Sequence, residues 1–310
     1  MKLAVFFVGE LNDDGFNSSA LAGVEVARQQ FGVDIQVISD VRYDQEDIRD
    51  RLHQVTALVD GVIFVGGQGD IAMPAIALDN PSKKFAVIQG QQVGSNLAAY
   101  DVMQEDSAFL AGCLAAKLTR SGIVSHLSGH RVRPGLKGRA AFVGGVKHTA
   151  PSVEVLTGFC GTQDDNNVTR IWAGDMFAAG ADILFTMLNG ARQGAIDACR
   201  EHGVLQIGNA LDWCARNPKI FVGSALARID QGVVTAVEDM LADRTPDAVV
   251  HFGLGEGDYV SLTTNSSVSQ HIRDEITHTA DQIRVGSVVV PTDYLGAEYV
   301  LAEASCSNSA

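Results

Sequence analysis

Long apolar runs and clustered cysteines are missing from this sequence of 310 residues. No apolar stretch approaches the roughly 20 residues that a membrane-spanning helix needs. The cysteines are odd in number and show no metal-ligand spacing, a pattern that favours a reducing compartment. We expect them to be buried apolar side chains, with the last as a free thiol in a frayed tail. They are Cys113, Cys160, Cys199, Cys214 and Cys306.

Recognisable catalytic motifs are also missing. The chain has no G-x-S-x-G elbow, no H-E-x-x-H and no cysteine cluster. The glycine-rich turn at 66–70 lacks the Lys-Ser/Thr ending of a phosphate-binding loop, and the turn at 253–257 precedes an expected strand instead of a helix. The sequence therefore predicts neither nucleoside-triphosphate nor dinucleotide binding, and we expect no cofactor and no metal.

Positive charge is scarce. The chain has 23 Lys and Arg against 37 Asp and Glu, a formal net charge of −14, which argues against nucleic acid or anionic lipid as a partner. An apolar content of 46% excludes disorder, and 32 glycines with only 6% aromatics are typical of a soluble α/β protein.

The start of the chain leaves two compartments open. Met1 and Lys2 lead directly into an apolar run, which leaves no room for a signal peptide. The protein is expected to be cytoplasmic if Met1 is the native start. It is expected to be periplasmic or surface-anchored if an export segment has been removed.

Strand-like and helix-like segments alternate along most of the chain. A chain of 310 residues also exceeds the usual size of one hydrophobic core. We therefore predict the α/β class, with two doubly wound parallel-sheet lobes and a ligand cleft between them. The first lobe is expected to comprise 1–120 plus about 245–290, and the second 121–244, with 291–310 as a closing strand and tail.

The second lobe is expected to begin after an unusual connector, residues 121–139. Its second half, 130–139, concentrates positive charge in an otherwise acidic chain. This half is either a solvated loop or hairpin, or a basic patch for an anionic ligand group or an acidic partner. Beyond it we predict strands at 140–146 and 168–172, a helix at 151–162 and a closing strand at 288–291.

The turn at 12–17 is the first candidate for a ligand site. It lies between an apolar run at 3–8, which reads as a buried parallel strand, and an amphipathic helix at 18–31. Ligands of open α/β sheets bind at the carboxyl ends of the strands. Asp14, Phe16 and Asn17 are therefore expected to face a ligand, although Asp14 or Asn17 could equally cap the helix.

Other polar and aromatic residues also follow predicted strands. Carboxylates can accept hydrogen bonds from vicinal hydroxyls, amides can pair with a base edge, and aromatic faces can stack on a ring. Trp172 could instead be core, whereas Asp212 has no obvious helix to cap because Pro218 interrupts helical continuation. The candidates beyond the first turn are Gln68, Gln89, Trp172, Asn189 and Asp212.

Five segments are notable for occurring together and in one order along the chain. They are Asp13-Asp14-Gly15-Phe16-Asn17 with Ala20 and Gly23, Phe109-Leu110-Ala111-Gly112, Ala179-Gly180-Ala181-Asp182-Ile183, Ile207-Gly208 with Asp212, and Ser224 with Asp230. In this order they resemble the BMP family, the basic membrane protein or purine nucleoside receptor-like substrate-binding proteins of ABC transporters. The resemblance covers roughly residues 1–262.

The resemblance implies a type I periplasmic-binding-protein fold that holds a nucleoside in its cleft and presents it to a permease. It also implies ligand contacts for Asp14, Phe16 and Asn17, and a ribose contact for Asp212. The chain departs from the family pattern at ligand-facing positions. Gln89 stands where the family usually has an aspartate, and Ala227 where it usually has a lysine. The basic segment 130–139 resembles an insertion, and the lipid-attachment cysteine is absent.

Two functional hypotheses follow. The first is a non-enzymatic protein that closes its lobes around a nucleoside-like ligand, with the ring between Phe16 and Trp172. The second is a cytoplasmic enzyme or sensor on the same fold that acts on a nucleoside- or sugar-derived ligand, either neutral or anionic. In that case His148, Asp14 or Glu256 would do acid/base chemistry, and Arg131, Arg133 or Lys137 would hold a phosphate or carboxylate.

Overall fold

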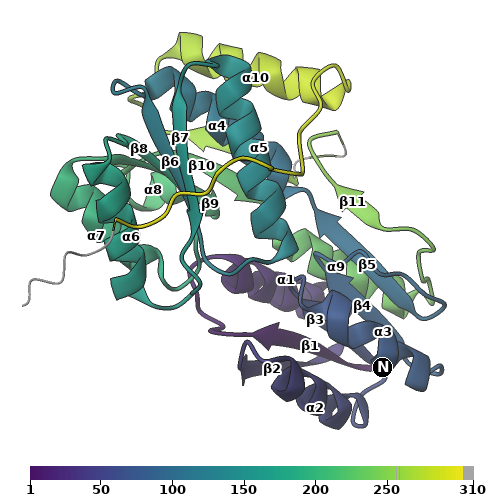
Figure 1. The fold of residues 1–310 in the computed structure, drawn as a ribbon. Helices are drawn as coiled ribbons and strands as arrows, with labels where there is room; N and C mark the ends of the chain where they lie inside the picture. Colours follow the sequence, from purple (N-terminus) through teal and green to yellow (C-terminus); the bar gives the residue numbers. More distant parts are fainter. Residues whose placement is uncertain (256, 258, 303–310) are drawn as a thin grey trace, which may run out of the picture.

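Two α/β lobes make up the protein, as predicted (Figure 1). The computed structural model describes residues 1–255, 257 and 259–302. Each lobe has a six-stranded sheet with flanking helices. None of the described helices combines the length and the apolar composition that crossing a membrane requires.

The first sheet is parallel throughout, in the order β11-β5-β4-β3-β1-β2. Alternate side chains of one strand face opposite sides of the sheet, so Leu3 and Val5 pack with α1 and α9, while Ala4 and Phe6 pack with α2 and α3. The elements of this lobe are β1 (Lys2–Val8), α1 (Phe16–Phe31), β2 (Asp34–Val41), α2 (Gln45–Thr56), β3 (Gly61–Val65), α3 (Gly69–Asp79), β4 (Lys84–Ile88), β5 (Leu97–Val102), α9 (Ile229–Leu241) and β11 (Val250–Phe252).

The second sheet has the order β12-β10-β9-β8-β6-β7 and is parallel except for β12, which runs antiparallel to β10. Its elements are α4 (Gln104–Leu118), β6 (Ile123–Ser128), α5 (Arg133–Thr149), β7 (Glu154–Phe159), α6 (Asn166–Ala178), β8 (Ile183–Met187), α7 (Arg192–His202), β9 (Leu205–Ala210), α8 (Trp213–Arg216), β10 (Phe221–Ala227), β12 (Val260–Thr264) and α10 (Gln270–Arg284).

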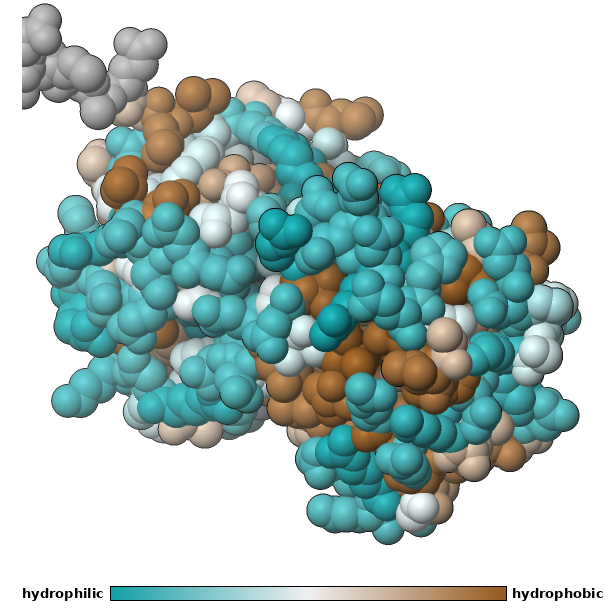
Figure 2. All heavy atoms as spheres, turned by 90° about the horizontal axis from the view of Figure 1, so that it is seen from below, coloured by the Kyte–Doolittle hydropathy of each residue, from teal (hydrophilic) through white to brown (hydrophobic). Residues whose placement is uncertain are grey.

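The chain passes between the lobes at three places: between β5 and α4, between β10 and α9, and between β11 and β12. The segment of about 245–290 therefore contributes β11 to the first sheet and β12 to the second. Seen from below the view of Figure 1, the surface is largely hydrophilic, in keeping with the net charge, and hydrophobic side chains gather near the middle of that face (Figure 2).

The sequence prediction was wrong about the first elements of the second lobe. The expected connector contains β6, the expected strand at 140–146 is the middle of α5, the expected helix at 151–162 contains β7, and the expected strand at 168–172 belongs to α6. The missed strand shifted the assignments only up to α6, because the strand expected at 182–188 and the helix expected at 191–202 correspond to β8 and α7. β6 escaped notice because three of its six residues, Ser125, His126 and Ser128, are polar although buried.

Two further elements differ from expectation. Helix α3 was not predicted, and residues 288–291 form no strand within the described chain.

The polar side chains of β6 have partners inside the lobe. Buried His126 is neutral, because burial lowers its pKa to about 3, and its ring nitrogens contact Thr157 Oγ1 at 2.9 Å and Ser128 Oγ at 2.8 Å. Those partners explain how a strand with polar residues can lie in the centre of the lobe.

The last described residues run as an extended segment across the second lobe from α10 to α6 (Figure 1). The Tyr299 backbone N–H donates to Thr157 O at 2.8 Å, and the Tyr299 hydroxyl donates to Asp175 Oδ2 at 2.7 Å. Glu298 accepts hydrogen bonds from Arg131, at 2.9 Å, and from Arg139. This segment therefore connects β7, α5 and α6 through hydrogen bonds to all three.

Replacing Glu298 with glutamine is expected to lower the free energy of unfolding at pH 7 by about 1 kcal/mol, because two charge-assisted contacts are weakened. Hydrogen bonding to Arg131 lowers the pKa of Glu298 to about 2. The contribution is thus present above the carboxyl's unfolded pKa of about 4.3 and is lost as the pH falls through the folded pKa. Urea unfolding from pH 7 down to pH 3 should show the difference shrinking. Glu201→Gln, in an exposed pair with Arg170, is the control.

Candidate ligand-binding site

A cavity lies where the carboxyl ends of the two sheets face each other. It encloses about 640 Å³ of empty space, part of it open to solvent. The first lobe contributes Val8, Phe16, Asn17, Tyr43, Val65, Gly66, Gly67 and Gln68, and the second lobe with α4 contributes Gln104, Ser128, His130, Val132, Pro134, Gly135, Gln163, Met187, Asn189 and Asn209.

The turn before α1 leads into Phe16 and Asn17, which form one wall of this cavity. Buried Asp13 accepts hydrogen bonds from the backbone N–H groups of Gly15, Asn17 and Ser18, each at 2.9 Å. Burial raises the pKa of Asp13, and these three donors act against that rise. Asp13, and neither Asp14 nor Asn17, therefore satisfies the free N–H groups of the helix.

Four of the predicted site residues line the cavity together: Phe16, Asn17, Gln68 and Asn189. The side-chain amide of Asn17 is fixed, since Nδ2 donates to Val8 O at 2.9 Å and to Glu10 O at 2.8 Å. These four residues come from both lobes, as expected for a ligand enclosed between them.

The other four predicted residues lie outside the cavity lining. Asp14 is exposed at the mouth of the cleft, where it forms an ion pair of 2.9 Å with Arg216 of the second lobe. Gln89 is buried behind the cavity, and its Nε2 donates to Val102 O at 3.0 Å.

Trp172 and Asp212 have local structural roles. Trp172 lies on α6 with its ring over Gly158, so the strand end on which its prediction rested is absent. Asp212 is the N-cap of α8, and its Oδ1 accepts from Ala215 N at 3.1 Å and from Thr263 Oγ1 at 3.3 Å. The expectation that Asp212 has no helix to cap was wrong, because one helical turn fits before Pro218.

Sequence reasoning missed several lining residues, above all Tyr43, Gln104, His130, Gln163 and Asn209. The rings of Tyr43 and His130 meet across the cleft with centroids 4.6 Å apart. Burial raises the pKa of Tyr43 and lowers that of His130, so both are uncharged at pH 7. Tyr43 follows β2, and Asn209 lies in the last part of β9. The rule that ligands meet strand carboxyl ends could have identified both.

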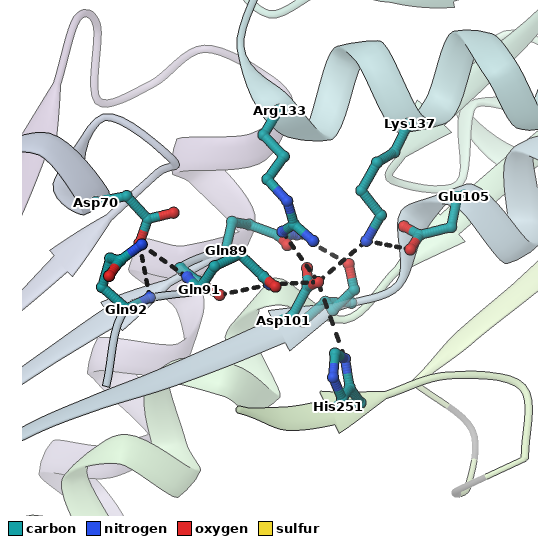
Figure 3. Close-up of polar contacts among 11 residues, drawn as sticks. Asp70, Gln89, Gln91, Gln92, Asp101, Glu105, Arg133, Lys137 and His251 are labelled. Atoms are coloured by element: carbon teal, nitrogen blue, oxygen red, sulfur yellow. Dashed lines mark hydrogen bonds and ion pairs between the residues drawn. The ribbon is translucent and has the colours of Figure 1, made fainter. Parts of the chain in front are cut away.

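The basic segment is neutralised within the protein: Arg131 and Arg139 pair with Glu298, and Figure 3 shows the contacts of Arg133 and Lys137. Lys137 contacts Asp101 at 3.0 Å and also Glu105, and Arg133 contacts Asp101 at 3.2 Å. The segment is the beginning of α5 and not the predicted loop or hairpin. It presents only His130, Val132, Pro134 and Gly135 to the cavity, so its charges face acidic side chains of the chain itself.

Neither of the described candidates for acid/base chemistry, Asp14 and His148, lines the cavity. His148 lies exposed in the last turn of α5, where its ring contacts Phe109. Glu256 and Cys306 lie outside the described residues. Among the residues that the structure describes, no group of three or more His, Cys, Asp or Glu could hold a metal ion.

Comparison with known proteins agrees with this geometry. The family model Bmp, described as ABC transporter substrate-binding protein PnrA-like, matches residues 1–293. Basic membrane protein A2 of Borrelia garinii subsp. bavariensis is 24% identical over 302 residues, which cover 94% of this chain and 88% of that protein. Basic membrane protein A of Borreliella burgdorferi is 25% identical over 314 residues, covering 97% and 91%.

Solved structures share the two-lobed fold. An ABC transporter solute-binding protein from Aeropyrum pernix K1 has a TM-score of 0.83 at 20% identity, covering 94% of each chain. A protein described as a transcriptional activator of the comK gene from Bacillus halodurans has a TM-score of 0.76 at 17% identity, covering 93% of this chain and 99% of its own. The predicted type I periplasmic-binding-protein-like architecture is thus confirmed.

Proposed function

Because the chain belongs to the Bmp family of PnrA-like ABC transporter substrate-binding proteins, we propose that it closes its two lobes around a nucleoside-like small molecule. A protein of this family binds a small-molecule solute and has an ABC permease as its partner. The cavity between the facing strand ends carries the proposal, since it offers aromatic rings and several amides to one enclosed ligand.

The lining favours an uncharged ligand. Every side chain on the cavity wall is neutral at pH 7, His130 included. Enclosing a phosphate or carboxylate there would leave its charge without a partner, which is costly. Phe16 and Tyr43 can pack against a heterocyclic ring, while amides from both lobes can pair with the ring edge or with sugar hydroxyls.

Contacts between the lobes supply a closing mechanism. The Asp14–Arg216 ion pair and the Tyr43–His130 ring contact join side chains from opposite sides of the cleft. Both contacts require the lobes to be close together, so opening the cleft at the three crossovers would break them. A closed shape of this kind is one that a permease could distinguish from the empty open form.

Phe16→Ala is expected to weaken nucleoside binding by at least about tenfold, because the ring loses its aromatic neighbour. Titration calorimetry with purine and pyrimidine nucleosides, bases and pentoses provides the measurement, and chromatography should recover the ligand unchanged. Phe31→Ala, at the other end of the same helix, is the matched control and should leave affinity unaltered. Absence of binding to every member of the panel would overturn the proposed function.

A further inference from the structure

The orientation of one cavity amide is set by a buried arginine. Arg192 is only 2% exposed, and its Nη2 donates to Asn209 Oδ1 at 2.7 Å. A guanidinium has donors and no acceptor, so the oxygen of Asn209 must face it and the Nδ2 group must face the other way. Arg192 is itself held by Thr186 Oγ1 at 3.0 Å, by Leu188 O and by the face of Trp213, at 4.6 Å from the ring centre.

Asn209 therefore offers the cavity a hydrogen-bond donor. Its Nδ2 group has no hydrogen-bond partner within the described part of the chain and remains accessible, and the residue lines the cavity. A flip of the amide would place Nδ2 against the Arg192 guanidinium, donor against donor. The fixed arginine thus excludes the alternative amide orientation.

Two other lining amides are fixed by backbone groups. Gln163 Oε1 accepts from Asn189 N at 3.2 Å, so its Nε2 group is the end left for a ligand. Asn17 Nδ2 donates to two carbonyl oxygens, so its Oδ1 is the atom that remains free to accept a hydrogen bond from a ligand. The second lobe consequently presents two donors, from Asn209 and Gln163, while the first lobe presents an acceptor, from Asn17.

On the basis of the proposed function, we propose that this arrangement of donors and acceptors makes the site selective. It favours a heterocyclic ring that carries an oxo group over a ring of the same size that carries an amino group in that place. A lactam edge carries a carbonyl acceptor beside an N–H donor, which suits donors from one lobe and an acceptor from the other. The corresponding amino edge carries an NH₂ donor beside a ring-nitrogen acceptor and so has the opposite polarity. Sugar hydroxyls both donate and accept, and therefore do not carry this discrimination.

Inosine and adenosine are suitable probes, because both are neutral, carry the same sugar and differ at this donor–acceptor pair. Titration calorimetry at pH 7 should show inosine binding about ten- to a hundredfold more tightly, since the amino ring leaves buried polar groups unpaired. Equal affinities, or tighter binding of adenosine, would overturn the inference while leaving nucleoside binding itself established. If neither compound nor any other nucleoside binds, the proposed function and the inference both fail.

Asn209→Asp and Gln163→Glu test the residues directly. Each keeps the oxygen that accepts from Arg192 or from Asn189 N, and each replaces the cavity-facing NH₂ group by an oxygen acceptor. Each should weaken inosine binding at least about tenfold and move the inosine-to-adenosine affinity ratio toward adenosine. A purely structural role would lower both affinities together and leave their ratio unchanged, which would contradict the inference.

The matched control is Asn167→Asp, the same chemical change at an exposed position on α6 of the same lobe. It adds the same negative charge without touching the cavity, so both affinities should stay unchanged. Thermal unfolding of all three variants checks folding, and Asn209→Asp should melt no earlier than the parent because its carboxylate pairs with Arg192.

Discussion

Replacing Lys137 with methionine is expected to lower the free energy of unfolding by about 3 to 5 kcal/mol, because it leaves buried charge without a partner. The Lys137 ammonium lies between the carboxylates of Asp101 and Glu105 (Figure 3). The three side chains are only 9%, 2% and 4% exposed. Urea unfolding at pH 7 measures the loss.

A second substitution should recover part of this loss. Asp101 keeps Arg133 as a partner in Lys137→Met, whereas Glu105 is left unpaired. In Lys137→Met with Glu105→Gln the unpaired charge is gone, so the double variant should be more stable than Lys137→Met alone by at least about 1 kcal/mol. The control is Lys117→Met, which removes a half-exposed pair with Glu275 and should cost less than about 1 kcal/mol. Equal losses for Lys137→Met and Lys117→Met would contradict the account of a buried network.

The pH dependence of Lys137→Met follows from Glu105. Burial raises the pKa of Glu105, and Lys137 opposes that rise. A carboxyl with a raised folded pKa favours folding when protonated, so its contribution is present below the unfolded pKa of about 4.3 and is lost as the pH rises through the folded pKa. Without Lys137 the folded pKa rises further, and the deficit of the variant should therefore shrink on acidification toward pH 4.3.

Gly145→Ala is expected to cost about 3 kcal/mol or more, because α4 and α5 approach too closely for a methyl group. A Cβ at Gly145 would lie 2.0 Å from Phe109 O, and one at Gly112 would lie 2.1 Å from Phe142 O. Both obstacles are backbone atoms of the opposite helix, so neither can be relieved by a side-chain rotation. Thermal and urea unfolding measure the effect.

The same substitution should also weaken ligand binding. Gln104 at the start of α4 and Gly135 in the first turn of α5 both line the cavity, so helices forced apart would move its wall. The matched control is Gly174→Ala on α6, where the nearest atom to a new Cβ is His202 Nε2 at 3.9 Å. It should stabilise the protein by about 0.5 to 1 kcal/mol through helix propensity alone. Small, equal effects at Gly145 and Gly174 would refute the close packing.

Apart from α3, the elements of the first lobe could be predicted from the sequence because their signals are local. Strands such as Gly61–Val65 are short apolar runs, and helices such as Gln45–Thr56 have a regular apolar period. The turn at 12–17 could be identified for the same reason, since a strand and a helix flank it directly. The wall formed by Phe16 and Asn17 was therefore expected, and both residues line the cavity.

The opposite wall depends on contacts between residues that are far apart in the chain. In the sequence, the glycines of α5 resemble those of a strand or a loop. Only the backbone positions of Phe109 and Phe142 show how closely α4 and α5 approach each other. The charges of 130–139 suggest a ligand or a partner until Asp101 and Glu298 are found beside them. Neither the close helix packing nor the internal charge neutralisation can be predicted from the residues that flank it in the sequence.

The sequence by itself determined the α/β class, the two-lobed architecture, the family resemblance and one wall of the site, because periodicity and strand–helix turns are encoded within a few residues. Only the tertiary structure decided which charges are neutralised internally and which way the amides of the second lobe face. The amide of Asn209, on strand β9, points its donor into the cavity because Arg192, on helix α7, holds its oxygen. The direction in which an amide presents its donor therefore depends on the contact between two residues, and neither residue determines it alone.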